Sequence, residues 1–479
     1  MLLKSNETHN IVFITIDALR YDTTHSLIKN NRLPNIRRLA KRSIFFENAI
    51  SVAPGTPLSV QSFLTSTYPF MYDGCLNFSP RKSFVELLRR ENFSTVSCQT
   101  NAFISKFFGF DRGFSSFFDG SEATNASRKR KRSPFAIFNI NKFFFEKRRD
   151  AKSLRLGTFL MFLSRFLYTY MNAFLTPFLS AEQLTGRFLK LIKENDRRFF
   201  AWIHYMDAHQ PHHPYRPDLF TSFKFGRIES KLGGRKSLSR DEILWLSSWY
   251  KDSVLYVDRF IGFLLSKLEE IGITLDNTYF ILTSDHGQEF LEHGMFGHGQ
   301  LYDETIHVPL IIAGPELSPC VLSQQISQID LAPTVLGLSG FHKNIPGSYL
   351  GRDLSQSLKE SRPQIVENPA ISEVGILVEK LMGARTRILK LDQGYCKVSY
   401  RFKNRKYIYS DMHNEDVSDE LYDLTKDPNE RYNLIEEETY LAREFLEKIK
   451  QHIRMEMKTK GRQREHLKIL SLSKTLSGI

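Results

Sequence analysis

The fold of this 479-residue sequence depends on the stretch Ser51-Val52-Ala53-Pro54-Gly55-Thr56-Pro57-Leu58-Ser59. An apolar, strand-like run, Ile44 to Ile50, precedes it, and a helix-compatible run, Val60 to Leu64, follows it. The pattern predicts a strand–turn–helix unit in which free backbone N–H groups at the helix start face an anion. Thr56 is therefore a candidate nucleophile toward a phosphate-like or sulfate-like group. Thr residues also cap helices routinely, so this stretch alone leaves both roles open.

Two other apolar runs end in candidate metal ligands. Ile11 to Ile16 leads into Asp17, and Thr278 to Thr283 leads into Ser284-Asp285-His286-Gly287. Both runs are typical of buried parallel strands, and ligands of open α/β sheets bind at the carboxyl ends of such strands. Carboxylates, an imidazole and a hydroxyl suit one divalent metal ion with an open position for a substrate oxygen. We therefore expect four side chains to meet at one edge of a sheet: Asp17, Thr56, Asp285 and His286.

Strand-like and helix-like runs alternate along most of the chain. Phe199 to Tyr205 and Val308 to Ala313 are typical of strands, and a long helix is predicted after Ser239. Glu242 follows Ser239 by three residues, as in a capping box, and apolar residues recur every three or four positions until Gly272. The alternation predicts a three-layer α/β/α sandwich with a mostly parallel central sheet.

The alternation weakens after about residue 365. Residues 380–391 and 395–409 are typical of antiparallel strands, and residues 436–457 of a charged amphipathic helix. We therefore expect a catalytic domain at 8–365 with a basic, Phe-rich insertion at about 121–180, a small C-terminal α+β subdomain at 366–460, and a basic tail without a clear pattern at 461–479.

The net charge of +13 is concentrated in one segment. Residues 128–155 contain eleven Lys or Arg residues and two acidic residues, a net charge of +9. They join a mostly apolar run, 156–179, which Arg165 interrupts, so an interfacial helix, a lid over the active site or a buried helix fits better than a membrane span. We expect residues 128–180 to contact an anionic membrane surface, with a solvated loop as the alternative.

The sequence also limits location and partners. The first ten residues are polar and contain no signal-peptide segment, so we expect a cytoplasmic protein that is peripheral at the membrane. Nucleic-acid binding is not expected, because the basic run 128–132 has no interleaved stacking motif.

Beyond these patterns, the sequence resembles the sulfatase branch of the alkaline phosphatase superfamily from Asn10 to about Leu434. The resemblance implies an alkaline phosphatase-like α/β fold and a metal-dependent enzyme that acts on ester bonds. The motifs that carry it are Thr15–Arg20, Pro34–Ala40, Thr56–Ser66, Phe110–Phe114, His204–His209, Thr283–Gly287, Glu292–Gly294, His307–Ile311 and Glu420–Pro428.

The resemblance assigns the four side chains at the expected sheet edge. Asp17, Asp285 and His286 match the metal ligands of the family. Thr56 aligns with the nucleophile, which also contacts the metal. One divalent metal ion is implied: manganese, zinc or calcium.

Four further residues are implied at the substrate. His209 matches the histidine of a His-x-Pro segment, which contacts the ester or protonates the leaving group. His298 takes the place of a lysine that often follows the Glu-His-Gly motif. Asn101 and His204 are weaker candidates for substrate binding.

The departures from the family pattern bear on the reaction. Type I sulfatases read Cys-x-Pro-Ser-Arg, where the Cys becomes formylglycine, and this chain has Thr56-Pro57-Leu58-Ser59-Val60. Threonine has one hydroxyl and cannot form the geminal diol from which formylglycine eliminates sulfate, but it can attack phosphorus. Ala18 replaces a second metal-binding Asp, which favours manganese or zinc over calcium.

Three functions follow as hypotheses. The first is a metal-dependent phosphoester hydrolase or phosphotransferase with a Thr nucleophile, acting on an anionic lipid-linked or glycan substrate. The second is a sulfuric ester hydrolase. The third is a non-catalytic sulfatase-fold protein that binds through its basic segment, against which the retained Asp17, Thr56 and Asp285 argue.

Overall fold

The computed structural model describes residues 9–72, 78, 81–120, 178–193, 198–210, 224, 227–228, 231–232, 237–375, 396–410 and 418–476. Nearly all of the expected insertion, with its basic segment and most of the apolar run, lies outside these residues, as does the strand expected at 380–391. Within the described part, no helix combines the length and the apolar character that a membrane crossing requires.

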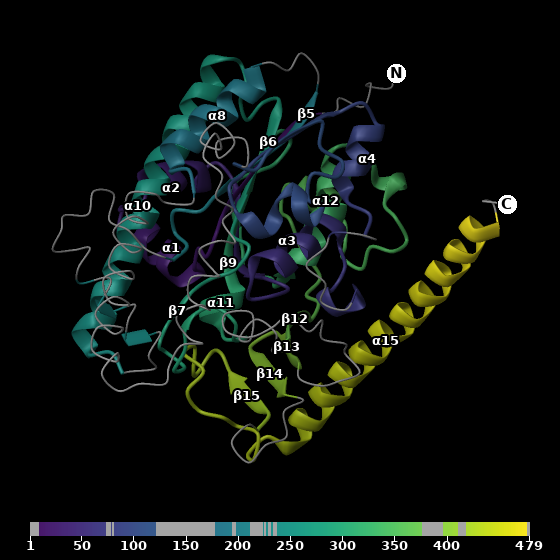
Figure 1. Ribbon diagram of the computed structural model, residues 1–479. Coiled ribbons are helices and arrows are strands. Elements are labelled where there is room, and N and C mark those ends of the chain that lie inside the picture. Colours follow the sequence, from purple (N-terminus) through teal and green to yellow (C-terminus); the bar gives the residue numbers. More distant parts are fainter. Residues whose placement is uncertain are drawn as a thin grey trace, which may run out of the picture.

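A nine-stranded mixed sheet forms the centre of the described structure (Figure 1). Its strands follow the order β10-β2-β9-β6-β1-β5-β3-β4, and β11 also pairs with β2. Among these strands β9 alone runs antiparallel to its neighbours, β2 and β6. The strands are β1 (Asn10–Ile16), β2 (Ile44–Ile50), β3 (Ser94–Cys98), β4 (Ser116–Phe118), β5 (Phe199–Tyr205), β6 (Thr278–Thr283), β9 (His307–Ala313), β10 (Cys320–Leu322) and β11 (Ile326–Ser327).

The sheet directions place the ends of the site-bearing strands together. β1 pairs in parallel with β5 and β6, and β2 has the same direction because β9 is antiparallel to both β2 and β6. The carboxyl ends of β1, β2, β5 and β6 therefore lie at one edge, where open α/β sheets bind ligands.

Helices cover both faces of the sheet, as the predicted three-layer sandwich requires (Figure 1). The helices on one face are α1 (Tyr21–Lys29), α2 (Pro34–Ala40), α8 (Ala181–Lys193) and α10 (Arg240–Glu270). Those on the other face are α3 (Thr56–Thr65), α4 (Phe84–Arg90) and α12 (Leu331–Leu338).

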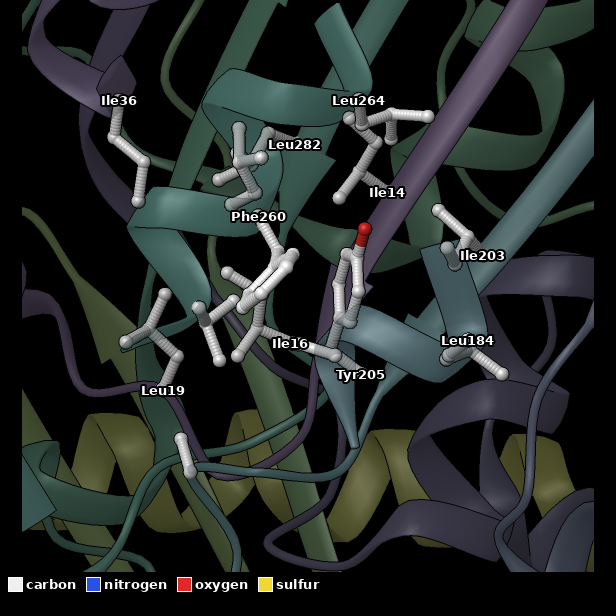
Figure 2. Close-up of a cluster of buried hydrophobic side chains, with 14 of the residues drawn as sticks. Ile14, Ile16, Leu19, Ile36, Leu184, Ile203, Tyr205, Phe260, Leu264 and Leu282 are labelled. Atoms are coloured by element: carbon white, nitrogen blue, oxygen red, sulfur yellow. The ribbon is translucent and has the colours of Figure 1, made fainter. Parts of the chain in front are cut away.

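The central strand β1 divides its side chains between two hydrophobic cores. Ile14 and Ile16 lie in the core under α2, α8 and α10, which Figure 2 shows, and Phe13 lies in the core on the opposite face. This alternation follows from the two-residue period of a strand, and both faces are apolar because helices cover both. Each fully buried side chain of this kind contributes roughly 1.5–3 kcal/mol. Figure 2 labels Ile14, Ile16, Leu19, Ile36, Leu184, Ile203, Tyr205, Phe260, Leu264 and Leu282.

The long helix α10 begins and ends as its sequence predicts. Ser239 accepts a hydrogen bond from the Glu242 backbone, and the Glu242 side chain accepts one from the Ser239 backbone, which completes the capping box. The helix ends at Glu270, and Gly272 follows with a φ of 80°, which glycine adopts without strain.

A second, antiparallel sheet follows the central one in sequence. Its strands are β12 (Ala370–Gly375), β13 (Cys396–Phe402), β14 (Arg405–Ser410) and β15 (Glu420–Asp423), in that order. The final helix, α15 (Thr439–Leu476), packs against β13 and β14 and is the yellow helix of Figure 1. We predicted a charged amphipathic helix only over residues 436–457, whereas α15 also contains the residues that follow, 458–476. They are rich in Lys, Arg, Gln and Leu, which favour helix, and lack proline.

Candidate active site

The four side chains expected at the sheet edge do meet there. Asp17 follows β1, and Asp285 and His286 follow β6. Thr56 is the first residue of α3, directly after the turn that leaves β2. Its Oγ1 atom lies 3.1 Å from Asp17 Oδ2 and 3.2 Å from His286 Nε2, and all four residues are buried. The geometry brings the residues together, and their chemical roles remain predictions.

Three of these side chains form a group that fits a divalent cation. Asp17 Oδ1 and Asp285 Oδ2 are buried and have no hydrogen-bond partner among the described residues. His286 Nε2 lies 3.5 Å from Asp17 Oδ1 and 3.6 Å from Asp285 Oδ2. His286 Nδ1 lies 2.8 Å from the Gly287 carbonyl, which only accepts, so Nδ1 carries the proton and Nε2 presents its lone pair. Two carboxylate oxygens without a hydrogen-bond donor among the described residues and one imidazole nitrogen that presents its lone pair are a donor set for a metal ion.

The charge states in this buried group suit a cation. Burial alone would raise the pKa of Asp17, but His209, His204 and His286 outweigh it, and this pKa lies well below its ordinary value. Burial and the Asp17 charge raise the pKa of Asp285. Burial lowers the pKa of His286 to about 4, so its imidazole is neutral at pH 7. A divalent ion would relieve the repulsion between the two carboxylates.

The weaker candidates, His204 and Asn101, both contact Asp17 in this structure. His204 Nε2 lies 3.2 Å from Asp17 Oδ2, and Asn101 Nδ2 donates to the same oxygen at 3.0 Å. His204 Nδ1 lies 2.7 Å from Thr15 Oγ1, which also accepts from Trp202 Nε1 at 2.8 Å. These contacts orient the Asp17 carboxylate, and the substrate-binding role stays a prediction.

His209 and His298 form a pair beside the metal group. Their Nε2 atoms are 3.3 Å apart, and the His298 ring centroid lies 4.2 Å from that of His286. Both Nδ1 atoms face carbonyl oxygens, at Gln210 for His209 and Pro54 for His298, so a hydrogen bond between the Nε2 atoms needs one further proton. Burial, His286 and His209 lower the pKa of His298 to about 3, so the His298 imidazole is neutral at pH 7.

Sequence reasoning missed the side chains that hold the Ser284–Asp285 backbone. Ser51 and Ser59 both donate to the Asp285 carbonyl, at 2.5 Å and 2.6 Å. Gln328 donates to the Ser284 carbonyl and, at 3.1 Å, to Thr283 Oγ1. The two serines lie on either side of Thr56 in the stretch Ser51–Ser59, and their closeness to Thr56 in the sequence could have indicated a role at the site. Nothing in the sequence around Gln328 indicated such a role.

The turn after β1 has two features that sequence reasoning also missed. Ala18 has a φ of 58°, a left-handed conformation that costs a non-glycine residue about 1–2 kcal/mol, and its N–H donates to Asp285 Oδ1 at 3.3 Å. The buried Arg20 guanidinium lies 2.7 Å from Asp22 and 2.6 Å from Glu292. Arg20 thus joins the Asp17 turn to the loop that carries the Glu-His-Gly motif.

Comparison with known sequences identifies the family. The sulfatase family matches residues 9–341. Arylsulfatase K of Xenopus laevis is 32% identical over 203 residues, which are 41% of this chain and 35% of that protein. An ulvan-active sulfatase of Formosa agariphila is 23% identical over 451 residues, 89% of this chain and 77% of that protein. The aligned part thus covers about a third of arylsulfatase K and most of the second relative.

Solved structures show the same fold at low sequence identity. The phosphonate monoester hydrolase of Agrobacterium radiobacter has a TM-score of 0.64 and 16% identity, over 94% of this chain and 96% of that chain. A structure solved with its substrate D-glucosamine-2-N,6-O-disulfate has a TM-score of 0.65 and 17% identity, over 94% and 98%. From the family match, this chain belongs to the sulfatase family, whose enzymes are metal-dependent, and the solved structures share its fold.

Proposed function

We propose that this enzyme hydrolyses phosphate-type esters, with Thr56 as its nucleophile. The observation that supports this most is the buried hydroxyl of Thr56, which donates to Asp17 Oδ2 at 3.1 Å and lies 3.2 Å from His286 Nε2. A threonine there has no route to a formylglycine hydrate, whereas its oxygen can form a bond to phosphorus and release it again.

Asp17, Asp285, His286 and Thr56 would hold one divalent ion. Bound there, the ion would supply Lewis-acid chemistry, making the Thr56 hydroxyl more acidic and withdrawing charge from the ester, while Asp17 Oδ2, which accepts from that hydroxyl, would take up its proton and pass it on to solvent. With Ala18 in place of another carboxylate, these residues offer fewer oxygens than calcium prefers, so we propose manganese or zinc.

The chain's own residues then carry the two steps. Thr56 Oγ1 attacks phosphorus, the bond from phosphorus to the leaving oxygen breaks, and His209 gives its Nε2 proton to that oxygen. In the second step, His209 takes a proton from an attacking water, whose oxygen bonds to phosphorus while the bond to Thr56 breaks, and the Thr56 oxygen regains a proton from solvent. An alcohol in place of water would make the same sequence a phosphotransfer. His298 stays neutral and holds His209 toward the site.

Sulfate ester hydrolysis is the second candidate, and it rests on the relatives. Their names describe an ulvan-active sulfatase, an endo-4-O-sulfatase and an N-acetylglucosamine-6-O-sulfatase. We propose an anionic ester on a glycan or a lipid-linked glycan as the substrate class for either reaction.

Trapping of a covalent adduct tests the nucleophile and separates the two reactions. The metal-loaded full chain is quenched with acid during turnover of an aryl phosphodiester or, separately, an aryl sulfate, and peptides are analysed by mass spectrometry. We expect an adduct on Thr56 from the phosphodiester, its loss in Thr56→Ala and its retention in Thr56→Ser. An adduct from the sulfate ester alone supports the second candidate, and turnover by Thr56→Ala at the wild-type rate contradicts both.

We also propose that the basic residues 128–155 bring the enzyme to an anionic membrane surface. The support is their net charge of +9, since each basic residue near such a surface adds about 1 kcal/mol. Liposomes containing phosphatidylserine should co-sediment the full chain, less so as salt increases, whereas neutral liposomes should not. If the chain ignores anionic liposomes at low salt, the membrane proposal is wrong and the lid interpretation of residues 156–179 is favoured.

A further inference from the structure

A second buried group of potential metal ligands involves none of the active-site residues. Glu373 lies on β12, and His452 and Glu456 lie one turn apart on α15. His452 Nε2 is 2.6 Å from Glu373 Oε1 and 3.7 Å from Glu456 Oε2. One ligand atom from each residue lies within 4.8 Å of the others, and the three residues are at most 7% exposed.

Two carboxyl groups of this buried group lie in contact with each other. The Glu456 carboxyl is hydrogen-bonded to that of Glu373, and two carboxylates in contact cannot both be ionised without a cation or a shared proton. The second oxygen, Glu456 Oε1, is buried and has no hydrogen-bond partner among the described residues.

We propose that Glu373, His452 and Glu456 bind one divalent transition-metal ion of the zinc type, separate from the catalytic ion. One imidazole and two carboxylates are ligands that zinc accepts, and the unpartnered Glu456 Oε1 offers a further donor. Ligand atoms around a tetrahedral zinc lie about 3.3–3.5 Å apart, given bonds of about 2.0–2.2 Å, so the observed 2.6 Å and 3.7 Å need only small adjustment. His452 and Glu456, four residues apart on α15, can bind one ion together.

The neighbours of this group indicate what the ion would stabilise. The Glu373 backbone N–H donates to the Val52 carbonyl at 2.8 Å, and the Ser372 hydroxyl donates to the Ser51 carbonyl at 2.6 Å. Val52 lies just before the turn that ends at Thr56. Glu373 Oε2 also accepts from the Phe70 backbone at 3.0 Å. The ion would therefore tie α15 to the strand that supports the nucleophile turn, whatever reaction Thr56 performs.

Counting bound zinc tests the proposal without measuring activity. The full chain is stripped with a chelator, given Zn²⁺, dialysed and analysed for metal per chain. Because the active site can also take zinc, the decisive background is Asp17→Asn/Asp285→Asn, which removes two catalytic ligands. We expect one zinc in this background and none after adding Glu456→Gln or His452→Gln. The matched control is Glu447→Gln, an exposed glutamate on the same helix, which should retain the zinc.

Further readouts keep the test decisive if a variant folds poorly. The wild-type chain should hold two zinc ions and Glu456→Gln one, with unchanged circular dichroism. Zinc should raise the melting temperature of the Asp17→Asn/Asp285→Asn chain by about 2–5 °C. A folded background chain that binds no zinc overturns the proposal, because the Glu373–Glu456 pair is then held by a shared proton. Equal zinc content with and without Glu456→Gln overturns it as well.

Discussion

At the scale of single residues, a hydrogen bond between the Nε2 atoms of His209 and His298 requires that one of the two imidazoles carries an additional proton. Only one of them can donate, because both Nδ1 atoms already face carbonyl oxygens and the two Nε2 atoms are 3.3 Å apart. Burial, His286 and His209 lower the pKa of His298, so His298 is neutral at pH 7. The proposed reaction therefore gives the two histidines different roles, with His209 as the proton donor and His298 as its neutral neighbour.

Replacing His209 by Ala should slow the reaction most for poor leaving groups. We expect kcat for an alkyl phosphodiester to fall by about 10²–10³, as for loss of other transition-state donors. An aryl ester with an acidic leaving group needs less protonation and should lose less. The control is His25→Ala, an exposed histidine on α1, which should leave kcat unchanged. If both esters lose activity equally, His209 does not protonate the leaving group.

The residues of the site differ in how far sequence could predict them. Asp17, Thr56 and Asp285 were predicted because each follows an apolar strand or its turn, and a parallel sheet brings such ends together. Ser51 and Gln328 escaped prediction because they bond to backbone carbonyls, and such contacts depend on the folded path and not on a spacing. The different surroundings of His209 and His298 could also not be predicted from the sequence, because they depend on the folded positions of the Gln210 and Pro54 carbonyl groups.

At the scale of secondary-structure elements, the small hairpin of β7 (Glu289–Phe290) and β8 (Phe296–Gly297) carries a buried acid. Burial and the neighbouring Glu304 and Glu292 raise the pKa of Glu289 from 4.5 to about 8. Because the folded-state pKa is higher than the unfolded one, the protonated form favours folding. Its contribution is complete below about pH 4.5 and is lost as the pH rises through about 8.

The variant Glu289→Gln should remove this pH dependence. Between pH 6 and pH 9 we expect the unfolding free energy of the wild type to fall by about 1–3 kcal/mol more than that of the variant. Urea titrations at several pH values measure the difference, and Glu360→Gln, an exposed site, should behave as the wild type. Parallel stability curves for wild type and Glu289→Gln would show that Glu289 stays ionised.

The start of α10 gives a simpler test at this scale. Ser239→Ala removes the side chain that accepts from the Glu242 backbone, and we expect a loss of about 1 kcal/mol in unfolding free energy. Ser239→Asp should retain most of it, because Asp also caps helices. If Ser239→Ala and Ser239→Asp lose the same unfolding free energy, the loss does not come from the missing side-chain acceptor at the start of α10.

Elements differed in predictability for physical reasons. The strand at 278–283 and the long helix after Ser239 have strong periodic patterns and cap signals, and both are present. The hairpin of β7 and β8 has strands of two residues, too short for any period to appear. The end of α15 was missed because its sequence pattern is weak, although its residues individually favour helix.

At the scale of the whole molecule, a buried ion cluster joins the small sheet to the central unit. Lys406 on β14 is fully buried and lies 2.9 Å from Asp303, on the short helix α11 (Asp303–Ile306), and 2.6 Å from Glu430. Arg401 on β13 also pairs with Asp303 at 2.7 Å. Burial alone would lower the pKa of Lys406, but Asp303 and Glu430 raise it above its ordinary value.

Removing the Lys406 charge should therefore destabilise the whole chain. We expect Lys406→Met to cost about 3–5 kcal/mol, because it leaves Asp303 and Glu430 buried with one fewer cation. The control is Lys450→Met, at an exposed ion pair on α15, which should cost at most about 1 kcal/mol. Urea unfolding measures both. A small effect at Lys406 would indicate that the small sheet and the central unit are only loosely joined.

The strand order of the central sheet has a consequence for how the chain is made. β1 lies in the middle of the sheet and is made before both of its neighbours, β5, which places Phe200 beside Ile11, and β6, which places Leu282 beside Ile14. While the ribosome is still adding the middle of the chain, this apolar strand has neither neighbour, and loop closure over such distances is slow. Until residue 283 has been added, β1 therefore lacks at least one of its two partners, and an unpaired apolar strand of this kind is prone to associate with other chains.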